Sequence, residues 1–322
     1  MKLSIIIPMY NCERYIADCL DSILNSDLPK GEYEVIIVND GSKDKGPEIA
    51  QDYVSKHDNF RYLTQENQGQ SVARNYGLKE AKGEYVWFVD GDDKVERFLC
   101  KFIDILHIYK LDSLVTTMVV TDEQGEKKGD VKEFNIPYNI VIYGRDVFFS
   151  DVPIGSVCGI FLSKSFLVEH ALFFVPGITQ QDVELSNRIF AYAKRVMFIK
   201  EISYIYIKHL ESTSMSQNPQ RRKKYILNTI DIILSLQNLS RDLAPIDSQL
   251  AERIEEKSQN QVLGLLINVF RNRRKWKRLG ITEDVINKLK ENKLYPMSYR
   301  YKSKKKLIVA HILNFNLLLR LL

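Results

Sequence analysis

Three carboxylates stand within four positions of the chain, at Asp90, Asp92 and Asp93, directly after the apolar run 85–89. A buried strand can deliver carboxylates to its C-terminal end, and open α/β folds bind ligands at that edge of the sheet. Clustered carboxylates repel one another unless a cation lies between them, and oxygen ligands suit Mg²⁺ or Mn²⁺, which usually hold phosphates. The run therefore predicts a site for a cation and a phosphate, although the same residue types also form ordinary acidic turns.

Two other predicted strands end in residues suited to a nucleotide. The strand 3–7 is followed by Pro8, which should stop the hydrogen-bond ladder, and by Tyr10, whose ring could lie over a base. The strand 34–38 leads to Asp40 at the same edge, where a carboxylate could accept a hydrogen bond from a base N–H. A turn or a local cap is the alternative role for Asp40.

A cation follows in the segment 67–77. Gly69 permits a tight entry into a helix, and the small residues Ser71 and Ala73 let that helix pack closely. Arg74 adds a positive charge beside the acidic edge. A capped amphipathic helix with a solvated arginine would have the same sequence, so the segment by itself leaves both interpretations open.

These residues must be positioned by an alternation of strands and helices over residues 1–120. This alternation predicts a parallel sheet in a three-layer α/β fold. Residues 122–218 have a mixed pattern, and from Pro219 the pattern is helical almost throughout. The predicted strands are 3–7, 34–38, 60–63, the run ending at Asp90, 113–121, 196–199 and 203–207, and the predicted helices are 12–25, 42–57 with Ser42 as cap, 71–81, 94–109 and 179–193.

The 322 residues have the composition of a globular protein that can bury a large core. The first eight residues have the pattern of a strand and not of a signal peptide. No run of eighteen apolar residues predicts a membrane-spanning helix. The four cysteines have no Cys-x-x-Cys spacing, so we expect reduced thiols in a cytoplasmic protein.

Charge divides the chain into two parts. Residues 220–322 hold 22 of the 46 Lys and Arg residues and 9 of the 41 Asp and Glu residues, a net charge of +13. The remaining 24 basic and 32 acidic residues give residues 1–219 a net charge of −8. A basic tail on an acidic body predicts an anionic partner for the tail. We therefore expect an α/β domain over 1–218 and a basic helical region over 219–322.

Three basic clusters, 221–224, 271–278 and 302–306, lie in this tail. The last precedes 307–322, a mostly apolar segment that is too short and polar to span a bilayer and is not cleanly amphipathic. Basic residues beside an apolar helix can bind an anionic membrane surface, and the alternative is a helix packed on the protein with its lysines in solvent. Trp276 could stack on a base, but no nucleic-acid-binding module accompanies it, so nucleic acid is not an expected partner.

Four motifs follow one another over residues 5–93: Ile-Pro-x-Tyr-Asn, Asn-Asp-Gly-Ser-x-Asp, Asn-x-Gly-x-Ser-x-Ala-Arg-Asn-x-Gly and Val-Asp-Gly-Asp-Asp. This order resembles the family 2 glycosyltransferases with the GT-A fold, and the resemblance continues more weakly to about residue 218. It implies an inverting transferase that uses a nucleotide-diphosphate sugar, most often a UDP-sugar, with a divalent cation. We therefore expect a GT-A-type three-layer α/β/α domain with a mostly helical C-terminal extension.

The resemblance also implies roles for single residues around the nucleotide. Pro8 and Tyr10 would line the uracil pocket, and Asp40 would bind the uracil. Arg74 would lie near the diphosphate, and Asp90 would approach the ribose.

In the same pattern, Asp92 would be the principal ligand of Mn²⁺ or Mg²⁺. Asp93 would be a second ligand or a positioning residue. The segment 204–216 resembles the strand and loop that close over the nucleotide, where His209 could be a third metal ligand or Lys208 a phosphate contact. A lone histidine is also common as an ordinary packing or surface residue.

Inversion requires a base opposite the leaving group. In the family this base is the Asp of a Glu-Asp pair that opens a helix, and Asp182 matches it, with Gln181 in place of the usual Glu. Thr179 could cap this helix, and a carboxylate in the first turn would also suit the helix dipole. Glu184 is the rival base, and Arg188 could hold Asp182 or the phosphate.

We therefore predict a metal-dependent, inverting hexosyltransferase that acts on a glycan or lipid-linked acceptor in surface polysaccharide or glycolipid synthesis. It would be cytoplasmic and peripheral to the inner face of the plasma membrane. The alternative is a non-catalytic scaffold at the membrane that binds nucleotide sugars. A nucleotidyltransferase would need a Gly-rich phosphate loop after the first strand, and residues 8–13 contain no glycine.

Overall fold

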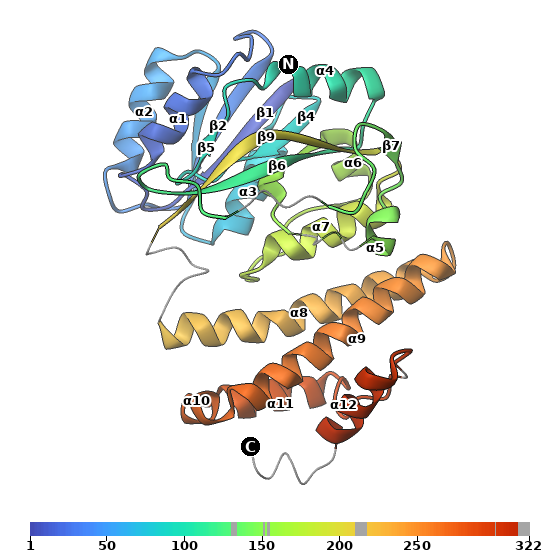
Figure 1. The fold of residues 1–322 in the computed structure, drawn as a ribbon. Coiled ribbons are helices and arrows are strands. Elements are labelled where there is room, and N and C mark those ends of the chain that lie inside the picture. Colours follow the sequence, from blue (N-terminus) through green and yellow to red (C-terminus); the bar gives the residue numbers. More distant parts are fainter. Residues whose placement is uncertain (130–133, 151, 153–154, 210–217, 300, 315–322) are drawn as a thin grey trace. The chain divides into compact units, whose positions relative to one another are not determined.

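The computed structural model describes residues 1–129, 134–150, 152, 155–209, 218–299 and 301–314 (Figure 1). It divides into two compact units. The first is formed by Met1–Gly177 and Gln181–Leu210, and the second by Ile178–Gln180 and Glu211–Leu322. The division lies a few residues before the boundary at 218 that the change of pattern predicts.

Among the described residues, the first unit is built on a mixed sheet of nine strands in the order β3-β2-β1-β4-β8-β6-β9-β5, with β7 paired to β9. Strands β1 to β4 are parallel, as is the pair β6–β9, whereas β8 is antiparallel to both of its neighbours and β5 and β7 are antiparallel to β9. The strands are β1 Leu3–Met9, β2 Tyr33–Asn39, β3 Phe60–Thr64, β4 Tyr85–Phe88, β5 Lys94–Val95, β6 Ser113–Asp122, β7 Val141–Ile142, β8 Ile160–Ser163 and β9 Val196–Lys208.

The prediction of a parallel sheet is therefore wrong for β8, which lies between β4 and β6. A parallel neighbour needs a crossover connection, usually a helix. The chain between β6 and β8 contains only the short elements β7, α5 (Asp146–Phe149) and η1 (Val157–Gly159) among its described residues. Without a helical crossover, the strand enters the sheet in the opposite direction.

Two element predictions also need correction. The runs 196–199 and 203–207 form one continuous strand, β9. The predicted helix 94–109 is a strand, β5, followed by helix α4 from Cys100. This helix begins late because the carboxylate of Asp27, from a distant loop, accepts hydrogen bonds from the backbone N–H groups of Leu99 and Cys100 at 2.7 and 2.8 Å. A capping residue so far away in the chain gives no local sequence signal.

Helices cover both faces of the sheet (Figure 1). On one face, Leu3 and Ile5 belong to a core cluster shared with α1, α2 and α4. On the other face, α3 packs so closely on β1 that a Cβ at Gly77 would collide with Ile6. The helices of this unit are α1 Ile16–Leu24, α2 Gly46–Lys56, α3 Gln70–Glu80, α4 Cys100–Tyr109, α5 Asp146–Phe149, α6 Lys164–Glu169 and α7 Gln181–Tyr192.

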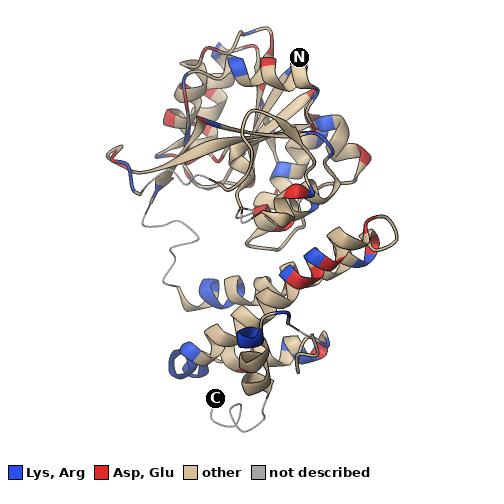
Figure 2. Cartoon of the chain, turned by 45° about the vertical axis from the view of Figure 1, so that its right-hand side comes forward, with Lys and Arg blue, Asp and Glu red and all other residues tan. Residues whose placement is uncertain are grey.

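The second unit is helical in its described part, as the sequence predicts. Its core includes Ile230, Val262 and Trp276. Because Trp276 is buried there, its ring is not available to stack on a base. Figure 2 shows basic residues, in blue, at the start of α8 and along α10. The helices are α8 Pro219–Leu243, α9 Ser248–Arg271, α10 Arg273–Arg278, α11 Ile281–Glu291 and α12 Lys304–Asn314.

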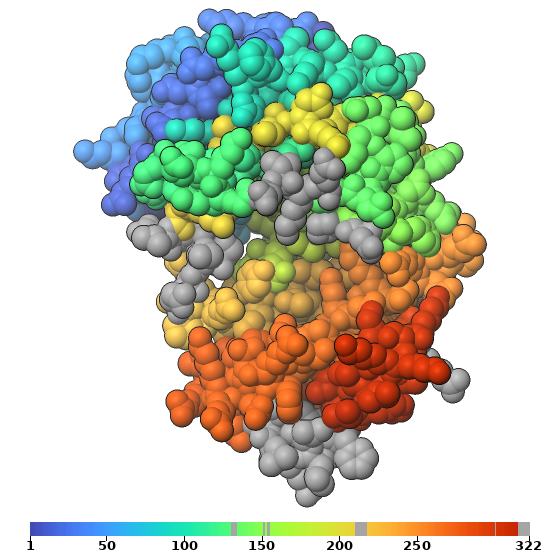
Figure 3. Space-filling model, viewed as in Figure 1, coloured from blue at the N-terminus to red at the C-terminus, as the bar shows by residue number. Residues whose placement is uncertain are grey.

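Helix α12 packs on this unit while keeping apolar residues exposed. Ala310 is buried, Leu313 packs on the core, and α12 adjoins α9 (Figure 3). Ile308 and Ile312 remain 58% and 50% exposed. Residues 315–322 of the predicted apolar segment lie outside the described residues. None of the helices in the described ranges combines the length and apolarity needed to cross a bilayer.

Candidate active site

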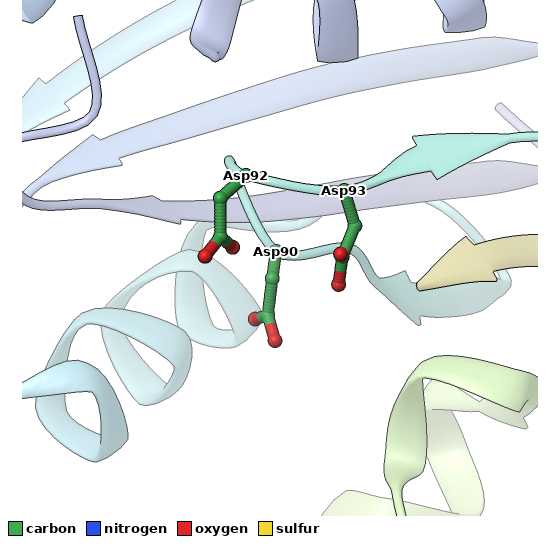
Figure 4. Close-up of side chains that lie close together, drawn as sticks. All are labelled: Asp90, Asp92 and Asp93. Carbon is green, nitrogen blue, oxygen red and sulfur yellow. The ribbon is translucent and has the colours of Figure 1, made fainter. Parts of the chain in front are cut away.

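The three acidic side chains that follow β4 point to the same side of their turn, at the C-terminal edge of the sheet (Figure 4). Asp90, Asp92 and Asp93 each offer one carboxylate oxygen, and these oxygens lie within 4.8 Å of one another. Oxygen ligands at this spacing suit Mg²⁺ or Mn²⁺. In the described part of the chain, this is the one cluster of acidic, His or Cys side chains with a spacing suited to a metal ion.

Burial and repulsion within the cluster raise the pKa values of two of its carboxylates. Burial and the charge of Asp90 raise the pKa of Asp92 to about 6. Burial and the charges of Asp90 and Asp92 raise the pKa of Asp93 to about 8. A cation between the carboxylates would favour their ionised forms. The residues present therefore fit a divalent cation, because without one part of the cluster is protonated near neutral pH.

A tyrosine of β9 fixes the geometry of this turn. The hydroxyl of the fully buried Tyr204 accepts a hydrogen bond from the N–H of Asp90 at 3.1 Å and donates one to Asp93 Oδ2 at 2.6 Å. The N–H of Ile207 donates to Asp93 Oδ1 at 2.8 Å. Both oxygens of Asp93 are thus engaged with β9, which favours the positioning role over that of a second metal ligand.

His209 is also engaged with the protein. Its Nε2 lies 3.0 Å from the backbone oxygen of Asp92, and its Nδ1 lies 2.9 Å from a carboxylate oxygen of Glu123. Burial lowers the pKa of His209, but these two hydrogen bonds and the charges of Asp92 and Glu123 raise it overall. Both ring nitrogens of His209 thus face acceptors of the protein, and these contacts help to hold the turn. Metal ligation by His209 stays an untested prediction.

A buried arginine joins the acidic turn to helix α7. The guanidinium of Arg74, which is 1% exposed, donates to Asp90 Oδ1 and to Asp182 Oδ1, each at 2.6 Å. It also lies over the ring of Phe174, with 5.0 Å between the guanidinium carbon and the ring centroid. Arg74 therefore brings together two carboxylates that are separated by 92 positions in the chain.

Asp182 stands in the first turn of α7, where the sequence predicts the base. Ser156 Oγ contacts its Oδ2 at 3.3 Å, and Arg74 holds the other oxygen. Burial raises the pKa of Asp182, although the charge of Arg74 opposes this effect. The N–H and the hydroxyl of Thr179 both donate to Asn228 Oδ1 at 3.1 Å, and capping of α7 by Thr179 stays an untested prediction.

Arg188 pairs with Glu184 and not with Asp182. Its Nε and Nη2 donate to the two carboxylate oxygens of Glu184 at 2.8 and 2.7 Å, and Nη2 also donates to the carbonyl of Phe173. The prediction that Arg188 holds Asp182 is wrong, because the guanidinium of Arg188 pairs with Glu184, one helical turn away. Its contact with a phosphate stays an untested prediction. Glu184 is buried in this ion pair, which makes it a poor candidate base.

The residues predicted around the base of the nucleotide lie at the same sheet edge. Pro8 does not stop the ladder, since β1 continues to Met9. The backbone N–H that Pro8 lacks would have pointed toward β4. That strand ends at Phe88, which pairs with Ile6, so it offers no partner opposite Pro8. Tyr10 is 52% exposed. Asp40 is buried and accepts hydrogen bonds from three groups of the loop 65–69. Asp40 thus holds the loop 65–69 in place, and its contact with uracil remains a prediction.

Three side chains that contact the carboxylates of Asp90 and Asp182 were not expected from the sequence. Besides Ser156, these are Gln70, whose Nε2 donates to Asp90 Oδ1 at 2.8 Å, and Cys158, whose Sγ lies 3.7 Å from Asp90 Oδ2. Gln70 stands in the motif around Gly69, at a position that the family pattern leaves free. Cys158 lies in the short element η1 and Ser156 directly precedes it, in a part of the sequence without a recognisable motif.

Without divalent cations, the protein should lose stability as the pH rises from about 4 to 8. The folded-state pKa values of Asp92, about 6, and Asp93, about 8, lie above the ordinary value of 3.8. Protonation of these two carboxylates therefore stabilises the folded state. The stabilisation is complete below the ordinary pKa of 3.8, and it is lost as the pH rises through the folded-state pKa values.

The melting temperature in EDTA should be measured against pH for the wild type and Asp93→Asn. The variant should gain stability relative to the wild type as the pH rises, and Mn²⁺ should reduce the difference. A difference between the two proteins that does not change with pH would contradict the assignment of this titration to Asp93.

Comparison with known sequences identifies similar proteins. Residues 4–170 match the family described as Glycosyl transferase family 2. EpsJ of Bacillus subtilis, named an uncharacterized glycosyltransferase, is 50% identical over 93 residues, which are 29% of this chain and 26% of EpsJ. The poly(ribitol-phosphate) β-glucosyltransferase of Bacillus spizizenii is 30% identical over 220 residues, which are 67% of this chain and 34% of that protein. The chain thus spans about a third or less of these two relatives.

A solved structure has the same fold. Residues 1–349 of TarS from Staphylococcus aureus, in complex with UDP-GlcNAc, superpose with a TM-score of 0.61 and 19% sequence identity. The alignment covers 96% of this chain and 79% of the TarS chain. The expected GT-A-type α/β/α domain with a helical C-terminal region is therefore confirmed, with a mixed sheet in place of a parallel one.

Proposed function

This chain belongs to glycosyl transferase family 2, and on that premise we propose that it transfers a sugar from a UDP-sugar to an acceptor hydroxyl with inversion. One observation carries the proposal. Arg74 ties a candidate base, Asp182, to the acidic turn that begins at Asp90, so a proton acceptor and a candidate cation site share one edge of the sheet.

In the proposed reaction, Asp182 accepts the proton of the acceptor hydroxyl through its carboxylate. The acceptor oxygen forms a bond to the anomeric carbon while the bond from that carbon to the diphosphate oxygen breaks, and UDP leaves with the electron pair. A raised pKa suits Asp182 for this step, since a base works best when its pKa approaches the operating pH. Attack opposite the leaving group inverts the anomeric centre.

Asp92 would hold Mn²⁺ or Mg²⁺, with Asp90 beside it and Asp93 fastening the turn. The bound cation would supply charge neutralisation for the departing diphosphate. Pro8, Tyr10 and Asp40 would face the uracil.

The names of similar proteins support the classes of donor and acceptor. TarS was solved with UDP-GlcNAc, and the Bacillus spizizenii relative is named for poly(ribitol-phosphate). We infer a UDP-sugar donor and a glycan or lipid-linked acceptor in surface polysaccharide synthesis. Such an acceptor places the enzyme at the cytoplasmic face of the membrane. We also retain 1–218 as the catalytic domain and 219–322 as the C-terminal region.

Release of UDP tests this function. A panel of UDP-sugars should be incubated with the protein and candidate acceptors, with Mn²⁺ or with EDTA. Release of UDP that depends on both Mn²⁺ and the wild-type Asp182 supports the transferase. Binding of UDP-sugars with no release for any acceptor would favour the scaffold alternative.

We propose that the membrane contact involves α12. On its exposed side, Ile308 and Ile312 follow Lys304 and Lys305, which combines apolar and basic groups. Lys304→Glu with Lys305→Glu should lower binding to vesicles that contain an anionic lipid by about tenfold or more, since each basic residue contributes about 1 kcal/mol near such a surface.

Lys30→Glu with Lys79→Glu is the matched control, because it makes the same charge change on exposed residues of the first unit. Binding should be measured by vesicle flotation. An equal loss in both double variants would show that net charge alone, and not α12, determines the binding.

A further inference from the structure

We propose that Gln181, acting through Gln70, is a positioning residue for Asp90, and that this relay requires an amide at position 181. Gln181 stands where the family pattern has Glu. The inference rests on the proposed function only in assigning Asp90 to the donor site. The proposed relay would explain why this chain has Gln181 where the family pattern has Glu.

Two hydrogen bonds connect the start of α7 to the acidic turn, and a third holds Gln181 to α3. The Nε2 of Gln181 donates to Oε1 of Gln70 at 2.7 Å, and the Nε2 of Gln70 donates to Asp90 Oδ1 at 2.8 Å. The hydroxyl of Ser71 contacts Oε1 of Gln181 and lies 3.0 Å from the carbonyl oxygen of Val175, so the two acceptors share its proton. Gln181 is only 6% exposed, so water has little access to its amide.

The direction of these bonds is set at Asp90. An ionised carboxylate can only accept hydrogen bonds, so Gln70 must turn its NH₂ group toward Asp90. Its carbonyl oxygen then faces Gln181, and the group at position 181 must donate. An amide can donate on this side and accept from Ser71 on the other, as Gln181 does.

A carboxylate at position 181 would break this order. An ionised Glu could still accept from Ser71, but its other oxygen would face the carbonyl oxygen of Gln70. If the amide of Gln70 turned to donate to Glu, its oxygen would instead face Asp90. In either orientation two acceptors meet, and the relay loses a hydrogen bond.

The relay acts on Asp90 and not on the neighbouring Asp182. The contacts of the Asp182 carboxylate are with Arg74 and Ser156, and the side chain of Gln181 bonds to neither. Asp90 Oδ1, in contrast, accepts from Arg74 and Gln70 together. A change at position 181 should therefore alter donor binding more than the proton-transfer step.

The test is a set of four variants: Gln181→Glu, Gln181→Met, Gln70→Lys and the double variant Gln70→Lys with Gln181→Glu. A lysine at position 70 can donate to two carboxylates at once, so it should rescue Gln181→Glu. Gln181→Met removes the amide without adding charge, and the exposed Gln70 can then bond to water. Affinity for UDP with Mn²⁺ should be measured by calorimetry, together with the donor KM and kcat.

Gln181→Glu should weaken UDP binding by about tenfold, while Gln181→Met and Gln70→Lys should each weaken it by about threefold or less. The double variant should return to within about threefold of Gln70→Lys alone. In Gln181→Glu, the donor KM should rise more than kcat falls.

Two results would overturn the relay. Either Gln181→Glu binds UDP as tightly as the wild type, or its defect persists in a folded double variant. If Gln181→Glu alone does not fold, the double variant decides by itself whether a second donor restores the site. A wild type that binds no UDP with Mn²⁺ would instead contradict the proposed function, so the two failures are distinguishable.

Discussion

Asp182→Asn should lower kcat by about 10³-fold, within the range that a positioned general base contributes. Asparagine has nearly the same shape as aspartate, and its amide oxygen can still accept from Arg74, but it cannot take the proton of the acceptor. The affinity for UDP with Mn²⁺ should stay within about threefold of the wild type, since the cation cluster is unchanged. Single-turnover transfer and calorimetry measure the two effects separately.

Glu184→Gln is the matched control for this prediction, because it neutralises a carboxylate two positions away on the same helix. Glu184 is held by Arg188 and buried, so we expect a loss of stability with kcat reduced by less than about tenfold in the folded fraction. A loss of kcat that is larger in Glu184→Gln than in Asp182→Asn would assign the base to Glu184.

Arg74→Met should reduce the free energy of unfolding by about 3 kcal/mol, because removal of one partner leaves buried charges uncompensated. Arg74 is 1% exposed, while the side chains of Asp90 and Asp182 are 23% and 24% exposed and thus have limited access to water. Methionine fills much of the volume that Arg74 occupies over Phe174. The decrease in the free energy of unfolding should therefore come mainly from the lost positive charge. Urea denaturation in EDTA measures it without the contribution of a bound cation.

A second substitution separates this effect from a packing defect. Arg74→Met with Asp182→Asn removes one of the two orphaned carboxylates and should recover about half of the lost stability, whereas it should remain inactive. If Arg74→Met loses less than about 1 kcal/mol, the arginine is not what holds the acidic turn to α7.

The sequence predicts the site well where a residue follows a strand of regular pattern. Asp40 and Asp90 stand at the ends of β2 and β4, and the parallel pairing of β1 with both strands brings them to one edge. Asp182 was expected to be near the acidic turn only because of the family pattern. The structure gives that proximity a physical basis in Arg74, whose positive charge the sequence shows but whose second partner it does not.

The remaining features depend on contacts between residues far apart in the chain. Tyr204 has the pattern of a core residue in a strand, and nothing near it indicates a bond to Asp93, 111 positions away. His209 was predicted as a ligand from the family pattern, and its two contacts, with groups more than 80 positions away, have no local signal in the sequence. The late start of α4 has the same origin in Asp27. Local patterns specify elements, and the partners of polar groups emerge from the tertiary fold.

The central claim is that Asp92 and its neighbours hold a divalent cation that binds a UDP-sugar. The most direct measurement is the melting temperature of the wild type and Asp92→Ala with a panel of UDP-sugars, each with Mn²⁺ and with EDTA. A ligand that binds the native state raises this temperature by mass action. We predict a rise for at least one UDP-sugar that requires Mn²⁺ and disappears in Asp92→Ala. No rise with any nucleotide, or an equal rise in EDTA and in the variant, would contradict the claim.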